Sequence, residues 1–366
     1  MIDAGYLLLQ PPYTPYEQKI RRTSLDVISL VNGTSEESWL ALEGLRWKRG
    51  ETDDGRELLM KRFKLLKDLL KTNTIKEAWK KELANLEPKG IVYTAGGAEQ
   101  LTNAFASMMT LRRVTRCKLP IVVCHFGDEI SERNKQFFHK HIEDLSFLDL
   151  SQVLFPSYHL PVFDGYAAPR SREDGYMVKI LAIRAAPFKE MVFMDVDSFA
   201  IQSPRLLFDE PGYLEHGSMF WPDIWRGRTE LWNFFNIEDQ SPWYERGDLG
   251  VWRDKVNQFQ SDAGWDIEKL KSVKVPARQA EAGQFLLNRE KHWDVLEWLL
   301  FINMHHNITY NVPGTLGDKD TFRVAFALAG KKDDFVQVDK GPLGAFVDHW
   351  KHGDNEVRTA AIYDCF

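Results

Sequence analysis

Strand-like and helix-like segments alternate from residue 89 onward, and this alternation limits the folds that the chain can adopt. Apolar runs typical of buried strands occupy residues 90–95, 120–126, 190–194 and 283–287. Helical periodicity separates these runs. Strands joined through helices are typical of βαβ units, which build a mainly parallel sheet with helices on both faces. We therefore predict an α/β fold of the Rossmann-like kind.

The length of the chain suits one large domain with an appendage. Hydrophobic residues make up 44% of the 366 residues, enough for a sizeable core. Residues 1–88 are polar, and between lysines in 59–70 the apolar residues recur at helical spacing, which predicts an N-terminal helical extension. We expect the main domain to span 89–345, followed by a C-terminal segment, 346–366.

Composition excludes several classes of partner and site. The formal net charge of −6 argues against non-specific binding of nucleic acid, which depends on a basic surface. Three cysteines without a Cys-x-x-Cys pair exclude a zinc ribbon and a thioredoxin-type site. No segment approaches the roughly 20 apolar residues of a membrane-spanning helix. We expect a soluble chain that meets a membrane only through an anchor outside this sequence.

An Asp-x-Asp motif, Asp195-Val196-Asp197, follows directly on the predicted strand 190–194. Ligands of open α/β sheets bind beyond the carboxyl ends of the strands. Carboxylates at positions i and i+2 of extended backbone point the same way, and together they can hold Mg²⁺ or Mn²⁺ while leaving positions for phosphate oxygens. Such a cation neutralises a diphosphate leaving group. The motif predicts a metal site with Asp195 and Asp197 as ligands.

Two other interpretations of the motif are available. Isolated aspartates often cap a strand-to-loop turn. A hydrophobic strand ending in Asp-x-Asp also opens phosphatases of the haloacid-dehalogenase type, in which the motif lies on the first strand and its first Asp is the nucleophile. Here the motif lies mid-chain, after two βα units, and Ser198-Phe199 follows it. The metal site is therefore the favoured interpretation.

Seven segments carry a family resemblance. In order they are residues 90–97 (GIVYTAGG), 111–120 (LRR…CKLP), 175–179 (GYMVK), 192–197 (VFMDVD), 220–223 (FWPD), 281–284 (EAGQ) and 317–323 (GDKDTFR). Together they resemble the fungal Golgi α-mannosyltransferases of the Mnn type, which build outer branches on glycoproteins from GDP-mannose. The resemblance spans about 89–323. It implies a GT-A fold, a divalent metal (Mn²⁺ or Mg²⁺), a GDP-mannose donor, a mannosylated glycan acceptor, retention of the α configuration, and a type II membrane protein of the Golgi.

The resemblance and the chemistry of the side chains assign candidate roles. Glu281, Asp318 and Asp320 are expected to position sugars and to stabilise positive charge at the anomeric carbon. The expected donor-binding residues are Tyr93, Thr94, Ala95, Gly96, Lys179, Asp195, Val196, Gly283 and Lys319. Trp221 and Asp223 are expected at the acceptor. His349, in the segment expected to close the donor site, is the candidate third metal ligand beside Asp195 and Asp197.

Simpler interpretations stand beside some of these roles. A lone helical lysine such as Lys179 is more often a solvated charge, and Asp318 could cap the helix that follows it. At the level of function, the same scaffold could use another nucleotide-sugar such as a UDP-hexose. A non-catalytic glycan-binding relative is the third hypothesis, although a protein without activity has no need of the intact pair Asp195 and Asp197.

Overall fold

The computed structural model describes residues 54–153, 172–226, 229–237, 244–246, 274–276, 278–315, 317–338, 350–352 and 355–357. A six-stranded sheet in the order β3-β2-β1-β4-β8-β5 lies at its centre. Its strands are β1 (Glu87–Thr94), β2 (Ile121–His125), β3 (Leu145–Asp149), β4 (Phe188–Met194), β5 (Ser218–Arg226) and β8 (Arg278–Asn288). Two short antiparallel pairs are described as well: β6 (Tyr244–Arg246) with β7 (Lys274–Pro276), and β9 (Trp350–His352) with β10 (Asn355–Val357).

The sheet is mainly parallel, as predicted. Strands β3, β2, β1 and β4 run parallel to one another, whereas β8 pairs antiparallel with both β4 and β5. Strands β3 and β5 were not predicted. The helix before β3 ends at His141, and the five residues of β3 at the sheet edge carry little periodic signal.

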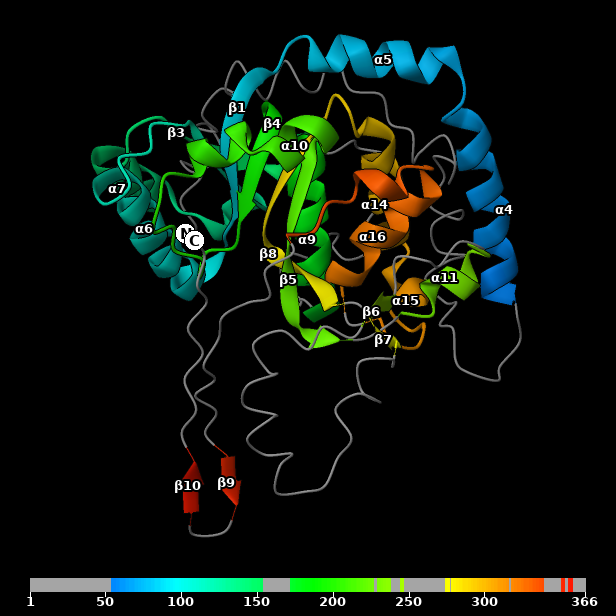
Figure 1. Ribbon diagram of the computed structural model, residues 1–366. Helices are drawn as coiled ribbons and strands as arrows, with labels where there is room; N and C mark the ends of the chain where they lie inside the picture. The colour runs from blue at the N-terminus through cyan, green and yellow to red at the C-terminus, as the bar shows by residue number, and fades with distance from the viewer. Residues whose placement is uncertain are drawn as a thin grey trace, which may run out of the picture.

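Helices cover both faces of the sheet, which confirms the predicted α/β architecture (Figure 1). The longer ones are α4 (Asp54–Leu69), α5 (Asn73–Leu83), α6 (Gly97–Arg113), α7 (Glu132–His141), α9 (Arg172–Ala185), α14 (Trp293–Met304) and α16 (Lys319–Leu328). Alternate residues of each strand enter different cores: Val92 and Phe193 pack with α9, α14 and α16, whereas Ile91 and Val192 pack with α6 and α7. This period of two is the expected pattern for a sheet buried on both faces.

The connections of the parallel strands create a topological switch point at one end of the sheet, where a crevice is expected. From β1 the chain passes through α6 and α7 to β2 and β3, on one side of β1. Helix α9 then carries it across the opposite face to β4, on the other side of β1. The order of the strands therefore reverses between β1 and β4. A ligand site is expected outside the carboxyl ends of these two strands, where the connections diverge.

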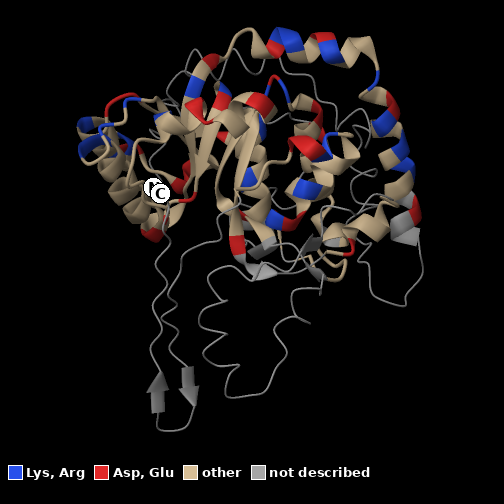
Figure 2. Ribbon diagram, in the orientation of Figure 1, with Lys and Arg blue, Asp and Glu red and all other residues tan. Residues whose placement is uncertain are grey.

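The N-terminal helices α4 and α5 share the main core. Leu59 and Leu66 of α4 and Trp79 of α5 are buried in the same cluster as Phe193 of the sheet. Figure 2 shows lysine, arginine and acidic residues along these two helices, in agreement with their polar sequence. The predicted helical character is confirmed for 54–83, while the proposed domain boundary at residue 88 stays a prediction.

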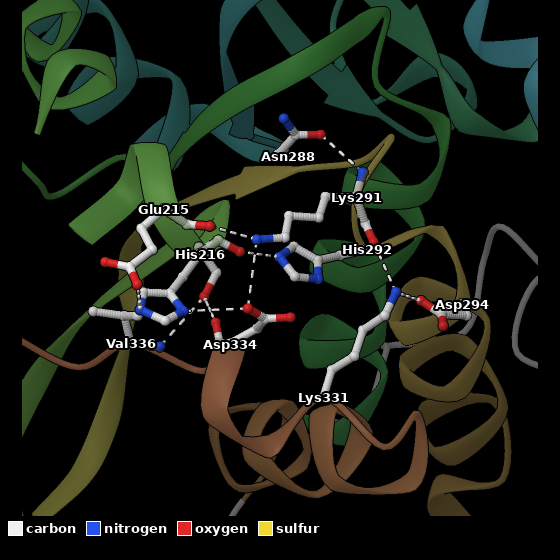
Figure 3. A network of polar contacts seen from close by, with 10 residues as sticks. Glu215, His216, Asn288, Lys291, His292, Asp294, Lys331, Asp334 and Val336 are labelled. Atoms are coloured by element: carbon white, nitrogen blue, oxygen red, sulfur yellow. Dashed lines mark hydrogen bonds and ion pairs between the residues drawn. The ribbon is translucent and has the colours of Figure 1, made fainter. Parts of the chain in front are cut away.

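A network of polar contacts joins residues 331–334 to the residues around His216 and Lys291 (Figure 3). His216 closes helix α10 (Pro211–His216), and its Nδ1 lies 3.2 Å from Asp334 of the short 3₁₀ helix η5 (Lys332–Asp334). Lys331 donates to the main-chain oxygen of Lys291 and to the carboxylate of Asp294.

Among the described helices, none is both long enough and apolar enough to cross a membrane.

Candidate functional site

The Asp-x-Asp motif lies where β4 ends, at the predicted crevice. The main-chain N–H of Asp195 donates to the oxygen of Gly283 on the neighbouring strand β8 at 2.6 Å. Ser198 closes the turn by donating its main-chain N–H to the oxygen of Asp195, so the turn is held by the main chain of Asp195. Ser107 of α6 donates its hydroxyl to the oxygen of Ser198 at 2.5 Å. The motif is therefore held from the sheet and from a helix, and its first carboxylate is directed to another partner.

That partner is Lys179 of helix α9, whose side chain is only 11% exposed. Its Nζ lies 3.0 Å from Asp195 Oδ2, 2.9 Å from the oxygen of Ala282 and 3.4 Å from Asp318 Oδ2. Burial lowers the pKa of Lys179, but the carboxylates of Asp318 and Asp195 raise it by more, and the net shift is upward. Lys179 is therefore a buried, charged ammonium, and the solvated-charge interpretation is wrong.

Asp318 reaches the same point from the start of helix α16. It occupies the N-cap position but makes no side-chain hydrogen bond to the helix, so the capping interpretation is wrong. Its side chain is 6% exposed, and its Oδ2 makes no hydrogen bond in the described part of the chain. Gly317 before it has φ +126°, a conformation that favours glycine, and a Cβ there would lie 2.8 Å from the ring of Tyr176.

Strand β8 brings a second carboxylate to the site. The side chain of Glu281 accepts a hydrogen bond from the N–H of Gly283 at 2.7 Å. Burial raises the pKa of Glu281; this N–H lowers it, and nearby Asp223 raises it. Gly283 is required by its surroundings, since a Cβ would lie 3.0 Å from Glu281 Oε1 and 3.2 Å from Asp195 Oδ2. Because Gly283 has no side chain, the carboxylates of Glu281 and Asp195 can both lie close to it.

A second lysine–carboxylate pair links α16 to strand β5. Lys319 Nζ lies 2.8 Å from Asp223 Oδ2, and the aspartate side chain is 7% exposed. Trp221, two residues earlier on β5, is half-buried and pairs with Glu281 across the sheet. Asp320, in the first turn of α16, is buried. The fold therefore brings Asp223, Glu281 and Asp318, from three of the predicted segments, to one region.

The end of β1 presents main chain rather than side chains. The ring of Tyr93 is fully buried in the core, with its hydroxyl 2.9 Å from Ser107 Oγ, so only its main chain could meet a ligand. Thr94 and Gly96 are half-buried at the strand end and Ala95 is buried. Gly96 has no room for a side chain, because a Cβ would lie 2.8 Å from the carboxylate of Glu129.

The predicted metal ligands are only partly described. Asp195 is half-buried and Asp197 is exposed, with half-buried Val196 between them. Burial raises the pKa of Asp195, and Lys179 opposes this shift. His349 lies outside the described residues, and the described ranges hold no group of three or more His, Cys, Asp or Glu side chains suited to a metal. Two carboxylates at a strand end suit a hard divalent cation, so the donor set fits Mg²⁺ or Mn²⁺.

Three contributors to the site were missed from sequence: Ser107, Ser198 and the main-chain oxygen of Ala282. Ser107 faces the core from within α6, and its bond to Ser198 joins residues 91 positions apart. A main-chain oxygen has no sequence signature at all. Only the burial of a serine on an apolar helix face could have drawn attention to Ser107.

The fold is an α/β domain with an acidic, lysine-bridged cluster of side chains at the switch point of its sheet. Residues 88–364 match the protein family described as "Mannosyltransferase putative", and the chain belongs to that family. The predicted resemblance is thereby confirmed.

Individual relatives agree with this assignment. The chain is 28% identical over 268 residues to alpha-1,2-mannosyltransferase MNN21 of Candida albicans, which covers 69% of this chain and 39% of that protein. It is 26% identical over 295 residues to alpha-1,2-mannosyltransferase MNN2 of Saccharomyces cerevisiae, covering 73% of this chain and 46% of that protein. The matched region thus spans less than half the length of these curated relatives. Among solved structures, the S. cerevisiae mannosyltransferase Ktr4p is 12% identical, with a TM-score of 0.41, covering 82% of this chain and 83% of that one.

Proposed function

We propose that this chain carries the catalytic domain of a retaining mannosyltransferase that moves α-mannose from GDP-mannose to a mannosylated glycan with the help of Mn²⁺ or Mg²⁺. Family membership supports the transferred sugar. The observation that carries the proposal is the meeting of Asp195, Lys179 and Asp318 at the switch point of the sheet. This position suits the diphosphate of a nucleotide-sugar.

Asp195 and Asp197 would hold the divalent cation, which when bound neutralises the diphosphate leaving group. His349 stays the predicted third ligand. The main chain of Thr94, Ala95 and Gly96 offers a surface without large side chains against which a nucleotide can lie closely. Gly283 and Val196 line the same end of the sheet.

The buried carboxylates of Asp318 and Asp320 and the half-buried carboxylate of Glu281 would position the donor sugar and stabilise positive charge at its anomeric carbon, because charges fixed in a poorly hydrated site act strongly. Retention would follow from attack on the same face from which GDP departs. Asp223, held by Lys319, and the indole of Trp221 would contact the acceptor from β5.

The curated relatives extend beyond the matched region. The setting that this proposal implies is that of a Golgi-resident, type II membrane protein. In this proposal 54–88 supports the domain, and 346–366 closes the donor site.

The test is the slow hydrolysis of nucleotide-sugars without acceptor in the presence of Mn²⁺. GDP-mannose should be consumed, and UDP-galactose and UDP-glucose should not. Asp195→Asn and Asp197→Asn should each lower kcat/KM by about 100-fold or more, because a metal supplies several kcal/mol of charge stabilisation. Asp333→Asn, an exposed aspartate of η5 outside the site, is the control and should leave the rate unaltered.

Each other outcome points elsewhere. Turnover of a UDP-hexose alone would favour the alternative donor. Glycan binding without any turnover would favour the non-catalytic relative. Full activity of Asp195→Asn with Mn²⁺ would remove the metal assignment.

A further inference from the structure

The side chain of Lys179 makes three contacts to oxygen atoms of the protein, two hydrogen bonds and one ion pair. A lysine ammonium has three N–H donors and no acceptor. Its Nζ has three oxygen neighbours: Asp195 Oδ2 at 3.0 Å, the oxygen of Ala282 at 2.9 Å and Asp318 Oδ2 at 3.4 Å. The ring of Phe193 lies 5.2 Å away and adds a cation–π contact. Two of the three donors are thus used in hydrogen bonds within the protein, and the ammonium is also paired with the Asp318 carboxylate.

The partners of Lys179 come from three different elements. Asp195 follows β4, Ala282 lies on β8 and Asp318 begins α16, while the lysine itself is on α9. The residues are far apart in sequence: 103 positions separate Lys179 from Ala282. One buried ammonium thus joins four elements at the point where the site forms.

Charge balance makes this ammonium necessary. The Asp318 side chain is 6% exposed, and its Oδ2 has only Lys179 as a charged contact among the described ion pairs. A buried carboxylate without a cation is costly, and removing one partner of a buried pair leaves the other uncompensated. Glu281 adds negative charge near the same ammonium. Without Lys179, the carboxylates would repel one another.

We propose that Lys179 is a positioning residue, an internal counter-ion that holds Asp195 and Asp318 together in one site, rather than a group that contacts the donor. The role follows from the geometry alone; its consequence for metal and donor rests on the proposed function. Because Lys179 compensates the charge of Asp318, this carboxylate does not repel that of Asp195. Asp195 then keeps its orientation at the end of β4, close to Asp197 in the sequence.

A double-mutant cycle tests the counter-ion role without reference to activity. Lys179→Met removes the charge at similar length, and Asp318→Asn removes the opposing charge at similar shape. Lys179→Met should lower Tm by about 5–10 °C, because it breaks a buried pair. In Lys179→Met/Asp318→Asn at least half of that loss should return. Losses that simply add would overturn the proposal.

Lys331 offers a matched control. It also donates to one carboxylate, that of Asp294, and to one main-chain oxygen, that of Lys291, in a partly buried setting away from the site (Figure 3). Lys331→Met should lower Tm by less, and combining it with Asp318→Asn should give additive losses. If Lys179→Met does not fold, recovery of folded protein in the double variant is the expected rescue. Failure of both to fold would count against the proposal.

Binding of Mn²⁺ alone, measured by calorimetry without nucleotide, separates positioning from donor contact. In Lys179→Met the uncompensated carboxylates should bind Mn²⁺ about 3–10-fold more tightly than in the wild type, whereas Lys331→Met should not differ. Affinity for GDP at saturating Mn²⁺ should change less than threefold. A tenfold loss of GDP affinity with additive stabilities would instead make Lys179 a donor contact. If the wild type binds no Mn²⁺, the metal of the proposed function fails, while the stability cycle still decides the role of Lys179.

Discussion

Single residues determine how closely the charges of the site can approach one another. Gly283 shows this most directly, because its missing side chain leaves room for Glu281 on its own strand and for Asp195 on the next. The N–H of the same glycine donates to Glu281, and its oxygen accepts from the N–H of Asp195. A single small residue therefore connects the predicted metal ligand with a predicted sugar-binding carboxylate.

A methyl group at this position should disturb both folding and binding. In Gly283→Ala, the new Cβ would displace one or both carboxylates, which lie 3.0–3.2 Å from it. We expect a loss of about 1–3 kcal/mol in the free energy of unfolding and at least about a tenfold loss in affinity for GDP with Mn²⁺, which equals about 1.4 kcal/mol of binding free energy. Urea unfolding and calorimetry measure the two effects.

Gly212 of α10 is the control, since a Cβ there would make only ordinary contact with Val336 at 3.6 Å. Gly212→Ala should be neutral or stabilise by up to about 1 kcal/mol, because alanine restricts the unfolded chain. Wild-type GDP affinity in Gly283→Ala would show that the two carboxylates do not need their present positions.

Among the secondary-structure elements, a buried charge cluster joins α5 to the helix that carries Lys179. Arg184 of α9 binds both oxygens of Glu82 in a two-pronged pair at 2.7 and 3.1 Å, and it also contacts Glu297 of α14 at 3.3 Å. Trp79 donates to Glu297, and its ring lies 4.1 Å from the Arg184 guanidinium. Arg289 donates to the main chain at the end of α9 and the start of β4. These contacts fix α9 between the N-terminal helices and the sheet.

Breaking this cluster should unfold the domain more readily. Arg184→Met would leave Glu82 and Glu297 buried without their main cation, and we expect a loss of about 3–5 kcal/mol in the free energy of unfolding, measured in urea. Lys80→Met, which removes an exposed ion pair with Glu77 on the same helix, should cost no more than about 1 kcal/mol. Equal effects of the two substitutions would mean that α5 is not held by the cluster.

For the whole molecule, buried histidines link stability to pH. Burial lowers the pKa of His292 to about 4 and that of His305 to about 3, although each ring also bonds a main-chain oxygen. His292 Nε2–H donates to the oxygen of His216 at 2.7 Å, inside the network of Figure 3. Both rings are therefore neutral in the folded state at neutral pH. They bind a proton more readily in the unfolded chain, where they are no longer buried.

The direction of the pH effect follows from the protons bound in each state. The ordinary histidine pKa is about 6.5, so between pH 6.5 and about 4 the unfolded chain binds more protons than the folded one. Stability should fall as the pH is lowered through this window, by up to about 1.4 kcal/mol per pH unit for each histidine. Urea midpoints at pH 7, 6 and 5 measure the slope. His292→Gln should flatten it, and His139→Gln, exposed on α7, should not; an unchanged slope in His292→Gln would contradict the argument.

Much of the fold was predictable because its signals are local. The runs at 90–95, 120–126 and 190–194 contain enough apolar residues to be strands on their own evidence, and the helices between them enforce parallel pairing. The antiparallel placement of β8 and β5 was not predictable, since no local pattern states which edge of a sheet a later strand joins. The position of Asp195 at the end of a central strand was predicted and is observed.

The sequence by itself determined the α/β class, the family and the acidic segments that the site contains, because periodicity and short motifs are properties of neighbouring residues. Only the tertiary structure decided what those residues do. It turned Asp318 from a helix cap to a partner of Lys179 and buried the ring of Tyr93 in the core. The physical reason is distance along the chain: a buried ammonium selects its carboxylates in space, and its partners here lie 16 to 139 residues away.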